Sequence, residues 1–108
     1  MNFNEHYLEA AHEHCFSNEV EVRDSESACC IACAVPFPAR LATEVIRQLG
    51  DDNRTVFCPV CALDTVIGDC SGLPVNDPAF IVAMNRRFQN EPLGSEESWK
   101  EFLNASNQ

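Results

Sequence analysis

The sequence predicts an α+β fold in which a short β hairpin and two cysteine turns pack with about four helices. Three observations lead to this prediction. The chain contains two C-x-x-C pairs, β-rich runs at 54–57 and 65–67 flank the second pair, and apolar residues recur at helical spacing in the segments around them. Two such cysteine pairs beside a hairpin are typical of zinc ribbons, so the predicted centre of the fold is a zinc-ribbon-like unit.

Length and composition bound the organisation of the chain. Its 108 residues suit one domain, and 45% hydrophobic with 22% charged residues is the composition of a folded protein. We expect a single zinc-binding domain over 1–108, made of an acidic N-terminal helical segment (1–27), a zinc unit with an inserted helix (28–75) and C-terminal helices (76–108). No run of about 18 apolar residues and no secretory signal pattern occurs, so we expect a cytoplasmic location.

The N-terminal segment has the pattern of an amphipathic helix. From residue 2 to about residue 15, the side chains expected to pack recur about one helical turn apart: Phe3, Tyr7, Ala10, Ala11 and His14. The next segment, 19–22, alternates glutamate and valine, which fits either a short strand or further helix after a break at Ser17-Asn18. The sequence leaves both interpretations open.

A helix is predicted between the two cysteine pairs. The prolines of the segment 36–38 are expected to exclude regular strand pairing, and Pro38 suits the first turn of a helix. The segment 39–49 then carries a helical stripe that stops at a glycine, with Leu41, Val45, Ile46 and Leu49 before Gly50. The runs 54–57 and 65–67 are predicted to pair as the hairpin that carries the second cysteine pair.

Two more helices are predicted after residue 75. Asn76 and Asp77 precede Pro78 as a helix start, and a helix to about residue 89 is indicated by the stripe Phe80, Ile81, Met84 and Phe88. Ser95 is expected to cap a last short helix, whose apolar side comprises Trp99, Phe102 and Leu103.

The seven cysteines carry the strongest chemical signal. They are Cys15, Cys29, Cys30, Cys33, Cys58, Cys61 and Cys70, and the odd number rules out a complete disulfide framework. In a reducing compartment, paired cysteines are more often metal ligands or redox groups. The two C-x-x-C units comprise Cys30, Cys33, Cys58 and Cys61, with 24 residues between the pairs, and this spacing resembles that of a zinc site with a long insert.

A two-residue gap lets the chain curl so that both sulfurs face one ion and backbone amides point at the thiolates. Two such curls supply four sulfurs at about 2.3 Å, the closed tetrahedron of one structural zinc, with no open position for a substrate. A redox dithiol is the alternative, but it needs one motif at a helix N-terminus in a βαβ setting. Cys29 could replace Cys30 as ligand, whereas Cys15 and Cys70 are expected to be dispensable for metal.

The run from Cys58 to Pro74, C-P-V-C-A-L-D-T-V-I-G-D-C-S-G-L-P, resembles a group of small bacterial cytoplasmic zinc-ribbon-like proteins. In that group a C-P-x-C pair is followed by D-[ST]-V-I, an S-G turn, a proline and a final helix, and an earlier C-x-x-C pair is similar to Cys30–Cys33. The resemblance covers about residues 12–88 and implies zinc and a bacterial cytoplasm, but no reaction, because the group has no agreed activity. Cys29 and Cys70 depart from the pattern.

A second metal site would have to use the remaining histidines and aspartates. A metal-dependent hydrolase could use His12, His14, Asp64 and Asp69. On a helix, however, residues two apart point about 200° from each other, so the two histidines cannot share one ion. We expect His14 to be a packed, hydrogen-bonded histidine, and the two aspartates to form turns and cap backbone amides.

Charge suggests the class of partner. With 17 acidic and 7 basic residues the formal charge is −10, which disfavours nucleic-acid binding. A basic protein partner is expected to contact the acidic N-terminal residues Glu5, Glu9, Glu13, Glu19 and Glu21. The alternative interpretation is that these residues form a solvated surface without a partner. The predicted function is a non-enzymatic, zinc-stabilised interaction protein, such as an immunity or antitoxin-like inhibitor of a toxin or nucleic-acid enzyme. The alternatives are an adaptor or regulatory subunit, a metal-dependent hydrolase and a zinc-ribbon nucleic-acid binder.

Overall fold

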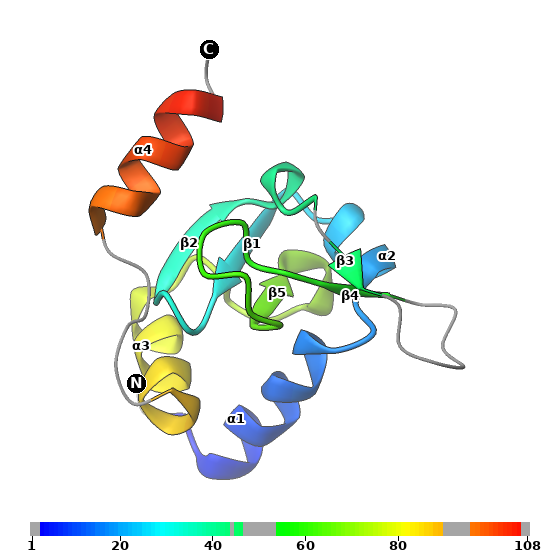
Figure 1. Cartoon of the computed structure of the whole chain (residues 1–108). Coiled ribbons are helices and arrows are strands. Elements are labelled where there is room, and N and C mark those ends of the chain that lie inside the picture. The colour runs from blue at the N-terminus through cyan, green and yellow to red at the C-terminus, as the bar shows by residue number, and fades with distance from the viewer. Residues whose placement is uncertain (1–2, 44, 47–53, 90–95, 107–108) are drawn as a thin grey trace.

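A computed structural model describes residues 3–43, 45–46, 54–89 and 96–106 of the chain (Figure 1). The elements are α1 (Glu5–His12), α2 (Glu19–Arg23), β1 (Ser27–Cys30), β2 (Val35–Pro38), β3 (Val45–Ile46), β4 (Thr55–Val56), β5 (Val66–Gly68), α3 (Pro78–Phe88) and α4 (Glu96–Ser106). Three short 3₁₀ turns lie at Glu13–Cys15, Ala39–Leu41 and Asp69–Ser71. This mixture of helices with small antiparallel sheets confirms the predicted α+β class.

The main sheet has the order β2-β1-β5, and all of its pairs are antiparallel. In the central strand β1, Ala28 lies opposite Phe37 of β2, and Cys29 lies opposite Ile67 of β5. A second, two-stranded sheet pairs β3 with β4. The first cysteine pair therefore begins at the end of a central strand, which has neighbours on both sides.

Two apolar clusters divide the core, and β1 contributes alternate residues to each because successive side chains of a strand point to opposite faces. The first cluster contains cysteines of both C-x-x-C turns, or knuckles, and is called the knuckle-side cluster. It includes Ala28 and Cys30 of β1, with Val22, Cys33, Phe37, Val56, Cys58, Val66 and Trp99. The helix-side cluster includes Cys29 and the following Ile31, with Leu8, Ala11, Cys15, Ile67, Val75, Phe80, Ile81 and Met84. The sheet thus separates the two clusters.

The helix-side cluster is covered by α1 and α3, which lie side by side (Figure 1). The predicted helix near the N-terminus is confirmed, and Asn4 caps it by accepting a hydrogen bond from the Tyr7 backbone N–H. The buried side chains are Leu8 and Ala11 of α1 and Cys15 of the 3₁₀ turn after it, so burial at Ala11 is confirmed, whereas Leu8 and Cys15 are buried in place of Tyr7 and His14. Tyr7 instead lies near the surface, where its ring packs against the edge of Phe80.

The two C-terminal helices are also confirmed. Asp77 caps α3 by accepting a hydrogen bond from the Ala79 backbone N–H, and Pro78 occupies the first turn, where its missing N–H costs nothing. Helix α4 joins the knuckle-side cluster through Trp99, whose ring lies 5.0 Å from the ring of Phe37 between centroids. The expected cap at Ser95 lies outside the described residues. The segment 19–22, left open between strand and helix, belongs to α2.

The inserted helix over 39–49 is wrong for the described part of that segment. After the 3₁₀ turn at Ala39–Leu41, the chain extends, and β3 pairs with β4 in the register Val45↔Val56. Thr43, Val45 and Ile46 are β-branched residues, which favour extended backbone. Strand β4 pairs with Val45 and Ile46, and an argument from periodicity alone does not include this partner. Residues 44 and 47–49 of the expected helix lie outside the described residues.

Two expectations about strand pairing are also wrong. The segment 36–38 belongs to β2, which pairs regularly with β1. Pro36 and Pro38 are tolerated because β2 is an edge strand, and they are exposed while Phe37 between them is buried. The runs 54–57 and 65–67 do not form one hairpin, because β4 pairs with β3 whereas β5 pairs with β1. The second cysteine pair therefore lies on a connection between two sheets.

Candidate metal centre

The four cysteines predicted from their spacing come together in the structure. The sulfurs of Cys30, Cys33, Cys58 and Cys61 all lie within 4.8 Å of one another. The Sγ atoms of Cys30 and Cys61 are 3.7 Å apart, and those of Cys33 and Cys58 are 3.8 Å apart. These contacts are too long for disulfide bonds of about 2.05 Å, and all four cysteines are free thiols.

The spacing of the sulfurs matches a tetrahedral metal site. Four thiolates at about 2.3 Å from one ion lie about 3.8 Å apart along the edges of the tetrahedron. Two of the sulfur pairs already have this separation. Three of the four residues are buried and Cys61 is half-buried, so the group is a compact site that can hold one metal ion with thiolates only.

Each knuckle has the same backbone form. In the first knuckle, the Cys33 N–H points at the Cys30 Sγ at 3.3 Å, and the Ala34 N–H donates to the Cys30 carbonyl at 2.9 Å. Ala34 has φ of 60°, in the left-handed region. This residue turns the chain sharply after the second sulfur, so that β2 can run back along β1.

The second knuckle repeats this arrangement. The N–H groups of Val60 and Cys61 point at the Cys58 Sγ, each at 3.4 Å, and the Ala62 N–H donates to the Cys58 carbonyl at 3.0 Å. Ala62 has φ of 62°. The amides directed at Cys30 and Cys58 confirm the expected curl and stabilise negative charge on the first sulfur of each pair. An alanine follows both pairs in the sequence, a repeated signal that the sequence analysis did not use.

Strand alternation decides between Cys29 and Cys30. Cys30 faces the other three sulfurs, whereas Cys29 faces the helix-side cluster next to Cys15 and is fully buried there. Burial raises the pKa of Cys29 to about 12 and raises the pKa of Cys15 further, so both remain protonated small hydrophobic groups. Cys70 is exposed on the 3₁₀ turn after β5. Among the described residues, the metal centre therefore contains four of the seven cysteines.

The sulfur cluster shares its protons unequally. The hydrogen bond from the Cys30 thiol, with further contributions from Cys33 and Cys58, lowers the pKa of Cys61 far below that of an ordinary thiol. The hydrogen bonds that Cys30 makes with Cys33, Cys58 and Cys61 raise the pKa of Cys30 in turn. A divalent ion at the centre takes the place of these shared protons, so its binding releases protons and weakens as the pH falls.

Two buried polar residues support the site and were missed by the sequence analysis. The hydroxyl oxygen of Thr65 lies 3.1 Å from the Cys30 Sγ, and its carbonyl accepts a hydrogen bond from the Ile31 N–H. The Asn85 side chain, on α3, donates to the carbonyls of Ile31 and Ala32 at 2.8 and 3.2 Å. These contacts fix the first knuckle from outside the ligand set, which is how surrounding groups orient metal ligands.

Trp99 of α4 lies beside the site in the knuckle-side cluster and is 4% exposed. Its indole N–H has no hydrogen-bond acceptor in good geometry within the described part of the chain. The pKa of Cys33 is lowered to about 7, first by the hydrogen bond with Cys30 and, as a smaller contribution, by the N–H of Trp99. The indole N–H thus lies near the Cys33 sulfur but does not meet hydrogen-bond geometry.

The histidines and aspartates considered for a second metal site do not assemble into one group, although Asp64 lies close enough to His12 to act on its pKa. The ring of His12 stacks on Phe88 at 4.0 Å between centroids, and His14 Nδ1 lies 2.9 Å from a carboxylate oxygen of Glu21. The Asp69 carboxylate accepts hydrogen bonds from backbone N–H groups of residues 26–27, as expected of a residue that caps amides. Within the described residues, only the four cysteines form a group of three or more potential metal ligands.

The five glutamates proposed for a partner do not share one environment. Glu5 and Glu9 lie within ion-pair distance of Arg87 on α3, and Glu13 is exposed. Glu19 is 7% exposed and binds Arg23 and Arg54, whose hydrogen bonds lower its pKa, with Arg54 contributing most. Glu19 therefore does not belong to the expected acidic surface. The amphipathic helix α2 turns its side chain toward the arginine that precedes β4. Glu21 is half-buried beside His14.

These features define a small α+β protein in which four cysteines lie close enough together to hold a metal ion. Nothing matches the chain among protein-family models, curated proteins or solved structures. The resemblance to small bacterial zinc-ribbon-like proteins therefore remains a prediction. Among the described helices, none combines the length and apolar composition that crossing a membrane requires.

Proposed function

We propose that the four cysteines hold one structural zinc ion. Zinc prefers four tetrahedral thiolates in structural sites and leaves no position for a substrate. Iron also accepts four tetrahedral sulfur ligands, so the sulfur spacing supports tetrahedral coordination but does not distinguish zinc from iron. The closed sulfur group at the core, with its two matching knuckles, favours a stabilising role rather than catalysis.

Metal analysis of the purified chain tests this proposal. We expect about one zinc and no stoichiometric iron per chain. Cys58→Ser removes one ligand and should abolish stoichiometric binding, whereas Cys70→Ala should keep it, because Cys70 lies outside the sulfur group. Cys15→Ala and Cys29→Ala should also retain metal in the folded fraction. Full zinc content in Cys58→Ser, or its loss in Cys70→Ala, would contradict the ligand set.

We further propose that the protein is a non-enzymatic interaction protein that binds a basic protein partner, in the reducing cytoplasm. The observation that carries this proposal is the charge. The formal charge of −10 becomes about −12 when four thiolates bind one divalent ion, and residues 1–28 hold seven carboxylates against one arginine. Such a field steers basic partners and repels nucleic acid. An inhibitor of a basic toxin or nucleic-acid enzyme is the concrete form of this function.

Affinity capture from an extract of the source cells, followed by kinetics with the purified partner, tests the proposal. Charge-steered association slows with salt, as the screening length falls from about 10 Å at 0.1 M to about 3 Å at 1 M. We expect a basic partner whose on-rate falls with salt. A neutral or acidic partner, or an on-rate that salt does not change, would contradict the proposed function.

A further inference from the structure

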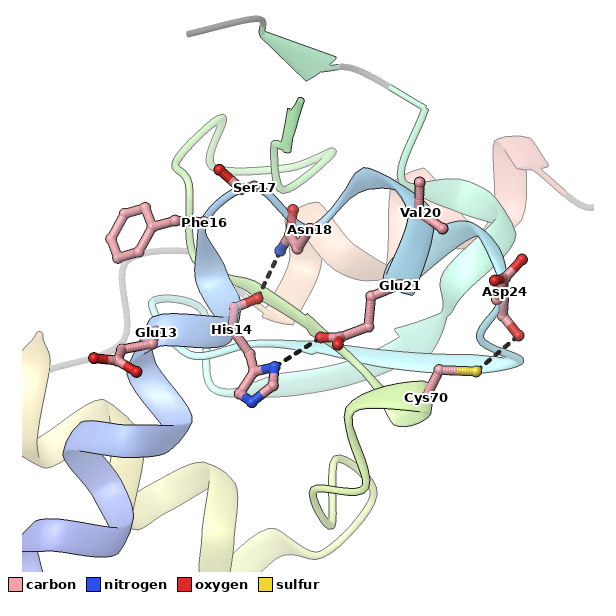
Figure 2. A pocket seen from close by; sticks show the side chains of 9 residues that line it. All are labelled: Glu13, His14, Phe16, Ser17, Asn18, Val20, Glu21, Asp24 and Cys70. Carbon is pink, nitrogen blue, oxygen red and sulfur yellow. Dashed lines mark hydrogen bonds and ion pairs between the residues drawn. The ribbon is translucent and has the colours of Figure 1, made fainter. Parts of the chain in front are cut away.

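A groove of about 390 Å³ lies where the chain passes from α1 into α2. Figure 2 shows the side chains that line it, among them Glu13, Phe16, Val20, Glu21, Asp24 and Cys70. They come from the 3₁₀ turn after α1, from α2 and from the 3₁₀ turn after β5. The groove is separate from the four-cysteine site, because none of those four cysteines lines it.

The groove presents large apolar side chains that stay partly exposed in the folded chain. Phe16 is 38% exposed and Val20 is 60% exposed, although α2 buries Val22 almost completely on its inner face. Scattered exposed apolar residues are ordinary, but here two large ones line the same concave surface. A partner side chain that covers them would bury apolar area that the chain alone leaves in water.

The groove also carries negative charge, and the described residues that line it include no lysine or arginine. Figure 2 shows Glu13 and Asp24 at opposite ends, with Glu21 between them beside His14. The carboxylates elsewhere near the N-terminus differ, because Glu5 and Glu9 share Arg87. Among the proposed acidic contacts, the carboxylates that no arginine of the described segments pairs with, Glu13 and Glu21, therefore lie at the groove.

The base of the groove is fixed by buried hydrogen bonds. The Asn18 side chain donates to the carbonyls of His14 and Val66 at 2.8 and 2.7 Å and accepts from the Val56 N–H at 3.0 Å. At the other end, the Cys70 thiol donates to the carbonyl of Asp24 at 3.1 Å. A surface held in this way loses little conformational freedom when it binds, which favours recognition of a short segment.

We infer that this groove docks a basic peptide segment of the protein partner, with one apolar side chain against Phe16 and Val20 and a lysine or arginine on each side directed at the carboxylates. Charge complementarity selects this occupant, because an acidic or phosphate-bearing ligand would meet three carboxylates. The inference rests on the proposed function and assigns its interface to the groove instead of the exposed face of α1. Apolar contact supplies affinity, and the flanking charges supply orientation and on-rate.

The test uses the full metal-loaded chain, labelled with ¹⁵N, and three short peptides at low salt. The probe is acetyl-Lys-Arg-Leu-Arg-Lys-amide. A peptide with glycine in place of leucine keeps the charge, and one with glutamates in place of the basic residues reverses it. We expect amide shifts to concentrate at residues 13–24 and around Cys70 with the first peptide, at least about threefold weaker binding with glycine, and no binding with the acidic peptide.

Matched variants identify the groups involved. Glu13→Gln with Asp24→Asn should weaken the first peptide about fivefold, whereas Glu5→Gln with Glu9→Gln, the same change of charge on α1, should alter it less than twofold. Phe16→Ala should weaken it about fivefold or more. If that variant loses its native spectrum, Val20→Ser makes the same test at a more exposed position.

Two negative outcomes are distinguishable. Shifts centred on α1 or α4, or equal effects of the two carboxylate pairs, would overturn the groove and leave the proposed function standing. The same holds if the glycine and leucine peptides bind equally. No binding of any basic peptide at millimolar concentration, together with a partner whose association ignores salt, would overturn both.

Discussion

The side-chain amide of Asn85 on α3 donates a hydrogen bond to the carbonyl oxygen of Ile31, inside the first knuckle, at 2.8 Å. The same nitrogen donates to the carbonyl of Ala32 at 3.2 Å, and Asn85 is only 4% exposed. A helix residue more than 50 positions along the chain therefore holds the turn that presents Cys30 and Cys33. This contact links the helix-side cluster to the metal centre on the other side of the sheet.

Asn85→Ala should weaken both the fold and the metal site. Loss of the amide leaves two buried carbonyls without their partner, which costs about 1–3 kcal/mol of unfolding free energy. We expect the first knuckle to loosen, so that a chelator removes the metal faster than from the wild type. Denaturant unfolding and chelator competition measure the two effects. Asn104→Ala, an exposed asparagine on α4, is the control and should change the unfolding free energy by less than about 0.5 kcal/mol.

Equal behaviour of the two alanine variants would show that Asn85 is not a support of the metal site. A loss of stability in Asn85→Ala without faster metal release would place its effect in the packing of α3 alone.

Ala62→Gly should stabilise the protein despite removing a methyl group. Ala62 is exposed and has φ of 62°, a conformation that costs an alanine about 1 kcal/mol or more and costs glycine almost nothing. Greater freedom of glycine in the unfolded chain offsets part of the gain. We expect a net increase in unfolding free energy of up to about 1 kcal/mol, measured by denaturant unfolding of the metal-loaded protein.

The matched control for Ala62 is Ala79→Gly, which makes the same change at an exposed position in the first turn of α3. That variant should lose about 0.5–1 kcal/mol, because glycine has a poor helix propensity. A loss of similar size in both variants would contradict the left-handed conformation of the second knuckle.

Trp99 offers a test in which the direction of the effect is informative. A metal ion that fixes negative charge on Cys33 gives the buried indole N–H an acceptor, and such a hydrogen bond is worth about 1 kcal/mol. We therefore expect Trp99→Phe to weaken metal binding about two- to tenfold. Replacement by 3-benzothienylalanine keeps the size of the ring system and removes only the N–H, so it should show most of the same loss.

Chelator competition measures these affinities, and cobalt substitution reports the change through the thiolate absorption bands. If the N–H instead stays unpaired when metal binds, removing it eliminates a buried unsatisfied donor. Trp99→Phe and the benzothienyl variant would then bind metal as well as the wild type or better, and the expected contact between α4 and Cys33 would be wrong.

How much of this structure the sequence predicts depends on how far apart in the sequence the interacting residues lie. The ligand set follows from spacing within two short motifs, α1 follows from local periodicity, and α3 follows from periodicity and from the cap at Asp77. Strand β1 has the sequence S-A-C-C, which lacks the β-branched and aromatic residues that mark strands. Because β1 was missed, the alternation that separates Cys29 from Cys30 was missed with it.

Long-range contacts account for the remaining differences. The prolines of β2 read as a break until the strand is known to lie at the edge of a sheet. Glu19 reads as a surface carboxylate until Arg54, 35 positions later, is placed against it. Asn85 and Trp99 have no local pattern that relates them to the cysteines, and only the packing of α3 and α4 reveals their relation to the site.

His12 should make the stability of the protein depend on pH between neutrality and mild acid. Its ring stacks on Phe88, and burial, with a smaller contribution from Arg87, lowers its pKa, although Asp64 partly opposes the shift. The folded protein therefore favours the neutral ring more than the unfolded chain does. Its stabilising contribution is fully present above the ordinary pKa of 6.5 and is lost as the pH falls from there through the lower folded value.

Denaturant unfolding of the metal-loaded protein from pH 7.5 to pH 5.5 measures this dependence. His12→Gln should unfold at lower denaturant at pH 7.5, because it loses the stacked ring, and its stability should fall less steeply toward pH 5.5. His6→Gln, at an exposed position on the same helix, is the control for the removal of a surface histidine. Protonation of the metal thiolates contributes equally to all three proteins, so the difference between slopes isolates His12. Parallel slopes for His12→Gln and the wild type would show that the stacked ring titrates alike in the folded and unfolded chains.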